Sequence, residues 1–250
     1  MSLWTEDARA VATYDAECVG RLDHGLYVAL ASEWAASDVV DLGCGTGVLA
    51  VELARSGCPV VGVDPSAVMV DAARTRPDGD LVTWIQGTAA ELPADAADLV
   101  VMTGHVAQYF VDEGEWESTL RDIRRALRPG GRVAFESRVP ERDWQHRWSP
   151  ELTRGTYPHP DGGTFTSWVE VVSRTGDESS FRMTHRGHTI LPDGTRLAHD
   201  ETLRFRSEAE LRASLDAAGF EVESLWGDWS RGPVRPGSDE LIFVATAPSP

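Results

Sequence analysis

The chain has 250 residues, of which 42% are hydrophobic and 25% are charged, the balance of an ordinary globular domain rather than of a disordered chain. Its formal charge of −17 argues against nucleic-acid binding, since phosphate contacts need a basic surface. It contains no Lys, which excludes a Schiff-base mechanism, and no apolar run approaches the roughly 18 residues of a membrane span, so no membrane partner is expected.

The first half of the chain predicts a helix followed by alternating strands and helices. Residues 5–36 are expected to be helical, because apolar side chains recur there at helical spacing. Short apolar strands are predicted at 38–42, 59–63, 81–86, 97–102 and 131–137, and helices at 47–56, 66–75 and 115–127. Such βα units predict a parallel sheet with helices on both faces and with ligands at the carboxyl ends of its strands.

The alternation ends at residue 138. The segment 138–163 has no clear period, whereas 164–173, 179–191 and 195–206 alternate like strands and are separated by turn sequences. They predict a three-stranded antiparallel meander. A capping box at Ser207 begins a helix at 208–218, and strands at 220–225 and 240–247 follow. We therefore expect an α/β, Rossmann-like fold with a seven-stranded, mostly parallel sheet and a small antiparallel insert.

A glycine-rich loop follows the first strand. Asp41 precedes Gly43, Gly45 and Gly47, and Asp64 ends the second strand. Glycines let the backbone approach a ligand with no Cβ in the way, the next helix points free N–H groups at the same place, and Asp64 can accept hydrogen bonds from ribose hydroxyls. A dinucleotide site would have Gly-x-Gly-x-x-Gly, and Asp41 would repel a pyrophosphate. The loop favours an adenosine-type cofactor that carries an ammonium group.

Four segments in order, 39–47, 63–66, 86–93 and 127–133, resemble the motifs of class I S-adenosylmethionine-dependent methyltransferases. The resemblance implies S-adenosyl-L-methionine as the cofactor. It departs from the family at Thr88, where an Asp often pairs with the adenine amino group. The cofactor-binding residues that it implies are Tyr14, Asp41, Gly43, Cys44, Gly45, Thr46, Gly47, Asp64, Pro65, Met69, Gly87, Thr88, Ala89, Thr103, Gly104 and Gln108.

The same resemblance implies methyl transfer to a small-molecule acceptor through an N or O nucleophile, by SN2 displacement. Such a reaction depends mainly on alignment and desolvation. The loop after the fourth strand borders the methyl group in the family, so His105 is the candidate catalytic residue, although it could equally serve only as a hydrogen-bond partner of backbone or cofactor. His185 shares a strand face with Phe181 and Met183 and is expected to point inward, where a structural role is more common.

Three parts of the chain follow from this interpretation. Residues 1–137 form the N-terminal helix and cofactor-binding core, 138–206 form an inserted lid, a homodimer face or both, and 207–250 form the last helix and two strands. A non-catalytic S-adenosylmethionine-binding protein is one alternative, and a nucleotide-dependent oxidoreductase is a weaker one.

Cys18, Cys44 and Cys58 lack ligand spacing, so we expect reduced thiols in a cytoplasmic protein and no metal site. The Arg-only, Ala-rich composition suggests a bacterial source.

Overall fold

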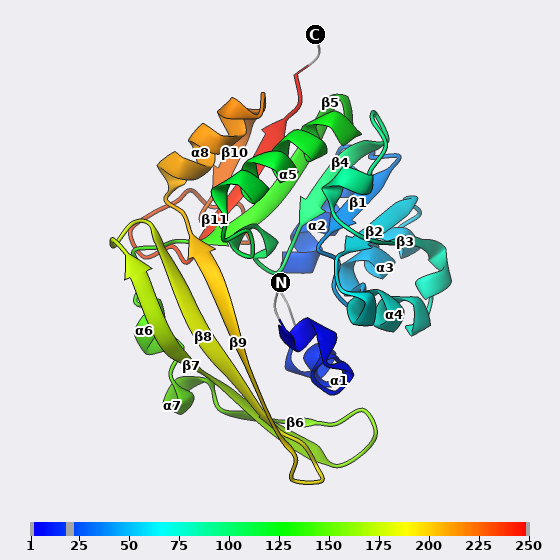
Figure 1. Cartoon of the computed structure of the whole chain (residues 1–250). Coiled ribbons are helices and arrows are strands. Elements are labelled where there is room, and N and C mark those ends of the chain that lie inside the picture. The colour runs from blue at the N-terminus through cyan, green and yellow to red at the C-terminus, as the bar shows by residue number, and fades with distance from the viewer. Residues whose placement is uncertain (1–2, 19–22, 249–250) are drawn as a thin grey trace.

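A seven-stranded sheet forms the centre of the computed structural model, which describes residues 3–18 and 23–248 (Figure 1). The strand order is β10-β11-β5-β4-β1-β2-β3, and only β11 runs opposite to the other six strands. The bounds are β1 Val39–Leu42, β2 Val60–Asp64, β3 Val82–Gln86, β4 Ala97–Met102, β5 Leu127–Arg138, β10 Glu221–Trp226 and β11 Glu240–Thr246. The chain reverses its direction of winding between β1 and β4, where open α/β sheets bind their ligands. The expected seven-stranded fold is confirmed.

Helices cover both faces of this sheet because both faces of its strands are apolar. On one face, α5 (Glu113–Ala126) and α8 (Glu208–Ala217) pack Trp116 and Leu211 against β4, β5 and β11. On the other face, α2 (Asp23–Glu33) and α3 (Val48–Arg55) bury Tyr27 and Leu53. The helix α4 (Ala67–Thr75) begins at Ser66, whose hydroxyl accepts a hydrogen bond from the N–H of Met69 at 3.2 Å. None of the helices in the described ranges is long and apolar enough to cross a membrane.

The single helix expected at 5–36 is wrong in its extent. The structure has a 3₁₀ turn, η1 (Leu3–Glu6), then α1 (Ala8–Glu17) and the separate helix α2, and residues 19–22 lie outside the described part. The two helices have different partners. Whereas α2 packs on the sheet, α1 lies against α4, η1 and the second sheet (Figure 1). One straight helix could not reach both surfaces, so tertiary packing overrides the continuous helical pattern.

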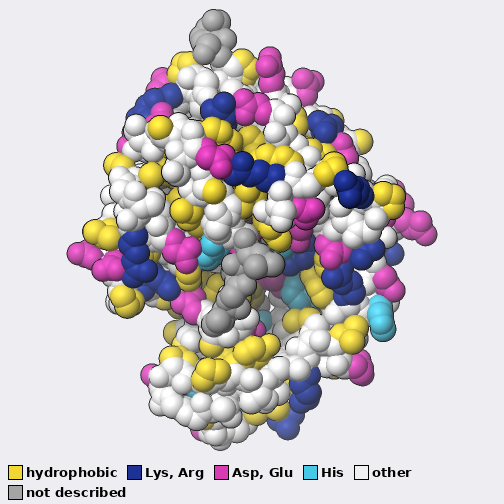
Figure 2. Space-filling view, turned by 180° about the vertical axis from the view of Figure 1, so that it is seen from behind, with side chains coloured by type: hydrophobic (Ala, Val, Ile, Leu, Met, Phe, Trp, Pro, Cys, Tyr) yellow, Lys and Arg dark blue, Asp and Glu magenta, His cyan; other side chains and the backbone are white. Residues whose placement is uncertain are grey.

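The second sheet is antiparallel and has four strands in the order β6-β7-β8-β9. Three of them, β7 (Thr164–Gly176), β8 (Phe181–Ile190) and β9 (Arg196–Phe205), confirm the predicted meander. The prediction missed β6 (Gly155–Pro158) and the short helices α6 (Trp144–Arg147) and α7 (Pro150–Thr153). A four-residue edge strand with Gly and Pro carries little pattern of its own, and pairing with β7 holds it in place. Figure 2 shows the surface hollowed between the core and this smaller sheet, with histidine side chains in and beside the hollow.

Candidate active site

The loop between β1 and α3 has a backbone that strongly favours glycine. Gly43, Gly45 and Gly47 have φ values of +75°, +53° and +78°, in the left-handed region. A Cβ on Gly43 would lie 2.5 Å from Val106, and one on Gly47 would lie 2.3 Å from Trp84, so these two positions are closed by packing. A Cβ on Gly45 would meet nothing within 4 Å. Gly45 is therefore the loop position at which a ligand can approach the backbone.

A cavity of about 500 Å³ lies beside this loop, a size that suits a small organic ligand. Asp15, Asp41 and Glu52 contribute carboxylates to its lining, and Arg76 contributes a guanidinium group. The cavity is therefore rich in acidic groups and suits a ligand with positive charge. The predicted cofactor residues that line it are Tyr14, Asp41, Gly43, Cys44, Gly45, Thr46 and Thr103.

Asp64 lies at the tip of β2 and is 8% exposed. Its two carboxylate oxygens accept hydrogen bonds from the N–H groups of Gly45 and Ser66, each at 2.9 Å. Burial raises the pKa of Asp64, and the two backbone N–H groups oppose that shift. The carboxylate thus fixes the glycine loop and lies beside its open position. Pro65 follows it, and Met69 is buried on α4.

The segment after β3 is hydrogen-bonded to the tip of β2, where Asp64 lies. The N–H of Gly87 donates to the carbonyl of Asp64 at 3.0 Å. Thr88 caps the 3₁₀ turn η3 (Ala89–Glu91), and its N–H donates to the Glu91 carboxylate at 2.6 Å in a capping box. Ala89 is buried. The predicted adenine segment therefore lies next to the predicted ribose carboxylate, and a helical cap engages the Thr88 side chain.

The N-terminal helix is fastened to the glycine loop by a polar clamp. Asp15 of α1 accepts a hydrogen bond from the Thr46 hydroxyl at 2.5 Å and forms an ion pair with Arg76 at 3.1 Å. Arg76 also donates to the carbonyl of Thr46. Sequence reasoning missed Asp15 and Arg76, and no local signal could have found them, because they meet only through the tertiary fold. The clamp holds α1, and with it Tyr14, at the cavity wall.

The loop after β4 contacts two carboxylates, one fully buried on β5 and one partly buried on β11. His105 has a φ of +62°, and its N–H donates to Glu136 of β5 at 2.7 Å. The Tyr27 hydroxyl donates to the other oxygen of Glu136, whose pKa is raised by burial. The His105 Nε2 lies 2.9 Å from the Glu240 carboxylate, and burial raises the pKa of Glu240 to about 7. Sequence reasoning missed both carboxylates, although an acidic residue inside the apolar strand β5 is a usable signal.

His105 and Gln108 both lie away from the residues that line the cavity. His105 directs its ring toward β11, and within the described ranges it is not a lining residue. Gln108 is fully buried on the 3₁₀ turn η4 (Val106–Gln108), and its carbonyl oxygen accepts a hydrogen bond from Arg138 at 2.9 Å. The Arg138 guanidinium group lies over the ring of Trp148 at 5.0 Å. Through Arg138, Gln108 thus links the core to the segment around Trp148, which leads to the second sheet. Gly104, at φ +71°, allows the loop after β4 to turn.

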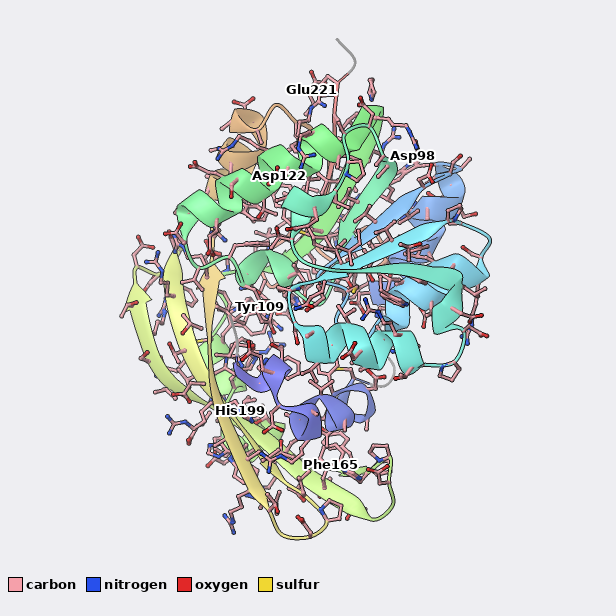
Figure 3. All side chains as sticks on the ribbon, turned by 45° about the vertical axis from the view of Figure 1, so that its right-hand side comes forward. Asp98, Tyr109, Asp122, Phe165, His199 and Glu221 are labelled. Carbon is pink, nitrogen blue, oxygen red and sulfur yellow. The ribbon has the colours of Figure 1, made fainter. Side chains whose placement is uncertain are left out.

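Polar side chains of the second sheet meet the core beside Tyr109. The Tyr109 hydroxyl donates to Glu201 of β9 at 3.1 Å, and the Trp4 indole N–H of η1 donates to the same carboxylate at 2.5 Å. His185 of β8 lies 3.3 Å from Glu201. Figure 3 shows Tyr109 at the junction of the core with β9, and His199 farther along β9 beside α1. Three segments that are distant in sequence therefore converge on Glu201.

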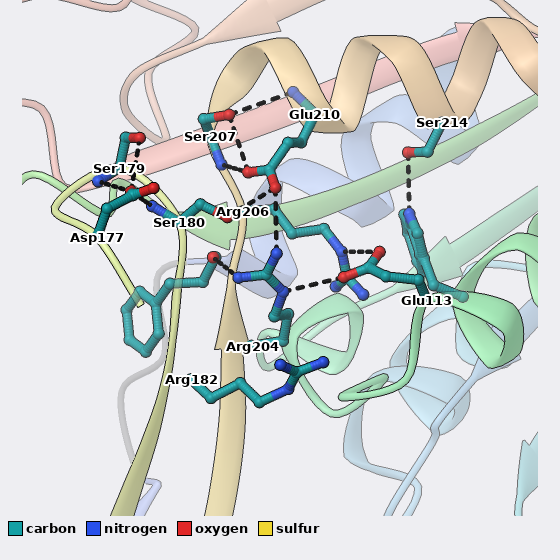
Figure 4. Close-up of polar contacts among 12 residues, drawn as sticks. Glu113, Asp177, Ser179, Ser180, Arg182, Arg204, Arg206, Ser207, Glu210 and Ser214 are labelled. Carbon is teal, nitrogen blue, oxygen red and sulfur yellow. Dashed lines mark hydrogen bonds and ion pairs between the residues drawn. The ribbon is translucent and has the colours of Figure 1, made fainter. Parts of the chain in front are cut away.

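Ion pairs at the end of β9 hold the second sheet in this position (Figure 4). Arg204 and Arg206 both pair with Glu113, the first residue of α5, at 3.0 and 3.2 Å. Arg204 also pairs with Glu210 of α8 at 3.1 Å. Arg206 is 2% exposed and donates to the carbonyl of Phe110 at 2.7 Å. The two guanidinium groups are shielded from solvent while their carboxylate partners are partly exposed, and the charge-assisted bonds favour a fixed angle between the two sheets.

Similarity to known proteins decides the family. Residues 39–131 match the family described as methyltransferase domain. Over 208 residues the chain is 31% identical to the cypemycin N-terminal methyltransferase of a Streptomyces species, covering 82% of this chain and 81% of that protein. The chain belongs to the class I S-adenosylmethionine-dependent methyltransferases. This confirms the expected enzyme class and its cofactor, S-adenosyl-L-methionine.

Solved structures of methyltransferases share the whole architecture. The CcbJ methyltransferase from Streptomyces caelestis superposes with a TM-score of 0.75 at 22% identity, over 98% of both chains. CalS10 from Micromonospora echinaspora, an amino pentose methyltransferase solved with bound S-adenosylmethionine, gives a TM-score of 0.64 at 20% identity, over 94% of this chain and 96% of that one. These likenesses cover the second sheet as well as the core and confirm the fold.

The site of this methyltransferase fits the cofactor of its family. Its cavity carries an excess of carboxylates, which suits the ammonium and sulfonium charges of S-adenosylmethionine. Gly45 leaves open space where the ligand must approach the backbone, and Asp64 lies at the strand tip where ribose hydroxyls are bound in such folds. Burial, together with the charges of Asp41 and Asp64, raises the pKa of the Cys44 thiol well above its usual value. The Cys44 thiol therefore stays protonated and adds no charge to the lining of the site.

Proposed function

We propose that the enzyme transfers a methyl group to the amino group of a small molecule. The observation that carries the proposal is the convergence of η1, Tyr109 and the second sheet on Glu201, because it brings polar side chains of the second sheet to the carboxyl end of β4, the same end of the sheet as the cofactor loop. The relatives support an amine, because one is described as an N-terminal methyltransferase and another as an amino pentose methyltransferase. The net charge of −17 favours the approach of a cationic acceptor.

The cofactor roles within this proposal follow from the position of each group. Asp41 would hold the ammonium group, the backbone at Gly45 would accommodate the methionine chain, and Asp64 would accept hydrogen bonds from the ribose hydroxyls. Thr88 would border the adenine, and Thr103 would border the reacting end. When bound, the cofactor supplies an electrophilic methyl group on a sulfonium sulfur.

The contribution of the protein is alignment and the exclusion of water. The Asp15 clamp keeps α1 over the loop, and the ion pairs of Arg206 keep the second sheet opposite it. Because both sides of the site are held in place, the acceptor and the methyl group need to lose less orientational freedom to reach the attacking geometry. Orientation of this kind gives the largest rate gains in such displacements. His105 remains our candidate for a polar group on the acceptor side, with Glu240 orienting its ring.

An acceptor screen with methyl-labelled S-adenosylmethionine tests the proposal. Label should pass to small primary or secondary amines, and mass spectrometry should place the new methyl group on nitrogen. The variant Gly45→Val serves as the control that cannot bind cofactor. Tight cofactor binding with no transfer to any amine or alcohol would instead favour a non-catalytic binding protein.

A further inference from the structure

A histidine–carboxylate pair on the inner face of the second sheet has no part in the proposed cofactor site. His185 of β8 and Glu201 of β9 are directly opposite in the strand register, so both side chains lie on one face of the sheet. The His185 Nε2 lies 3.3 Å from a Glu201 oxygen, and the two side chains are 13% and 9% exposed. The Trp148 ring lies 4.9 Å from the imidazole ring and covers it.

The geometry of the pair sets the protonation pattern of the imidazole. A neutral histidine beside a carboxylate carries its proton on the nitrogen that faces the carboxylate, which here is Nε2. The Nδ1 atom then carries a lone pair and can accept a proton. This Nδ1 is buried, and among the described residues it has no hydrogen-bond partner. Because buried polar atoms are normally paired, Nδ1 is the atom of this pair that is available to a proton donor.

The pair is also close to the cavity that holds the proposed cofactor site. Tyr14 lines this cavity, and its ring packs 5.1 Å from the Trp4 ring. The Trp4 indole N–H donates to Glu201, so Trp4 and Tyr14 link the pair to the cavity wall by direct contacts. The Trp4 contact further shows that Glu201 accepts an N–H donor from outside its own sheet. Tyr109 after η4 and Arg138 of β5 interact electrostatically with Glu201, Tyr14 of α1 interacts with Tyr109, and Asp200 of β9 interacts with His185.

We propose that His185 accepts a proton from the ammonium group of the acceptor, and that Glu201 is the positioning residue that orients the imidazole for this step. The inference rests on the proposed function. An alkylamine is protonated near neutral pH and has no lone pair with which to attack. Transfer of one N–H proton to Nδ1 leaves the electron pair on nitrogen and creates an imidazolium beside Glu201. The nitrogen pair then forms the N–C bond while the C–S pair leaves with sulfur, and the product is a methylated ammonium.

Acceptors of different basicity separate this role from a structural one. Cyclohexylamine is strongly basic and needs deprotonation, whereas aniline has a similar shape and is already neutral near pH 7. His185→Gln should lower kcat/KM for cyclohexylamine about a hundredfold, as expected for loss of a general base, and should leave aniline nearly unchanged. The matched control is His188→Gln, because His188 makes the same kind of pair with Glu170, at 2.9 Å, on the opposite face of the sheet. Equal loss with both amines would overturn the proposal.

A readout that does not depend on turnover comes from ¹⁵N NMR of the histidine rings. In the wild-type protein, His185 should show the tautomer protonated at Nε2, and Glu201→Gln should shift the balance of its tautomers. Cyclohexylamine should perturb the His185 Nδ1 signal, whereas cyclohexanol should not. An Nδ1-protonated His185, or no response to the amine, would refute the inference. If the wild-type enzyme methylates none of these compounds but binds cofactor, the proposed function fails, and the NMR experiment still decides whether the pair receives an ammonium group.

Discussion

Removal of the Asp64 carboxylate should affect cofactor binding and stability by separate amounts. In Asp64→Ala, the N–H groups of Gly45 and Ser66 each lose an acceptor at 2.9 Å. Hydrogen bonds to charged groups contribute about 1.5–3 kcal/mol each, but the variant also relieves the cost of burying a charge, which is visible in the raised pKa of Asp64. We therefore expect a net loss of about 1–3 kcal/mol in the free energy of unfolding, measured in urea.

The cofactor should lose the ribose contact in addition. Loss of charge-assisted bonds to the ribose hydroxyls corresponds to about 1.5–3 kcal/mol, which is roughly a 10- to 150-fold rise in the dissociation constant of S-adenosylhomocysteine by calorimetry. Asp71→Ala is the control, since Asp71 is exposed on α4 and, within residues 3–18 and 23–248, its carboxylate pairs with its helix neighbour Arg74. An unchanged dissociation constant in folded Asp64→Ala protein would refute the assignment of the ribose to Asp64.

Three further changes test other parts of the site. Gly45→Val should abolish cofactor binding in calorimetry, because a branched side chain at φ +53° is strained and would fill the open space beside the loop; undiminished affinity would contradict the site. His105→Asn, which tolerates φ +62°, should lower turnover without changing cofactor affinity, and a parallel loss of both would argue against an acceptor-side role. Burial raises the pKa of Glu240 from 4.5 to about 7, so the protonated carboxyl is the form that the folded protein favours. Its contribution to the free energy of unfolding is therefore fully present below about pH 4.5 and is lost as the pH rises through 7. Glu240→Gln should therefore gain up to about 3 kcal/mol over wild type between pH 4.5 and about pH 8 in urea unfolding, whereas a pH-independent difference would show that Glu240 titrates normally.

The core of this methyltransferase follows from local sequence pattern. Its strands are short apolar runs, and burial on both faces makes such runs recognisable without any knowledge of their partners. The glycine loop is equally local, because glycine adopts left-handed φ values without steric cost and Gly43, Gly45 and Gly47 all have such values. The tip of β2 also follows from the strand pattern. For these reasons the sheet, the loop and the position of Asp64 could all be read from the chain.

The tertiary structure alone decided which distant groups meet. The split between α1 and α2 depends on two packing surfaces, and the edge strand β6 depends on its partner β7. The clamp of Asp15 on Thr46 and Arg76, and the convergence on Glu201, join segments far apart in sequence. Their side chains carry no periodic signal, since each contact is a single polar pair fixed by the register and angle of the two sheets. Sequence pattern therefore predicted the glycine loop and Asp64, whereas only the fold brought together the groups of the clamp and those around Glu201.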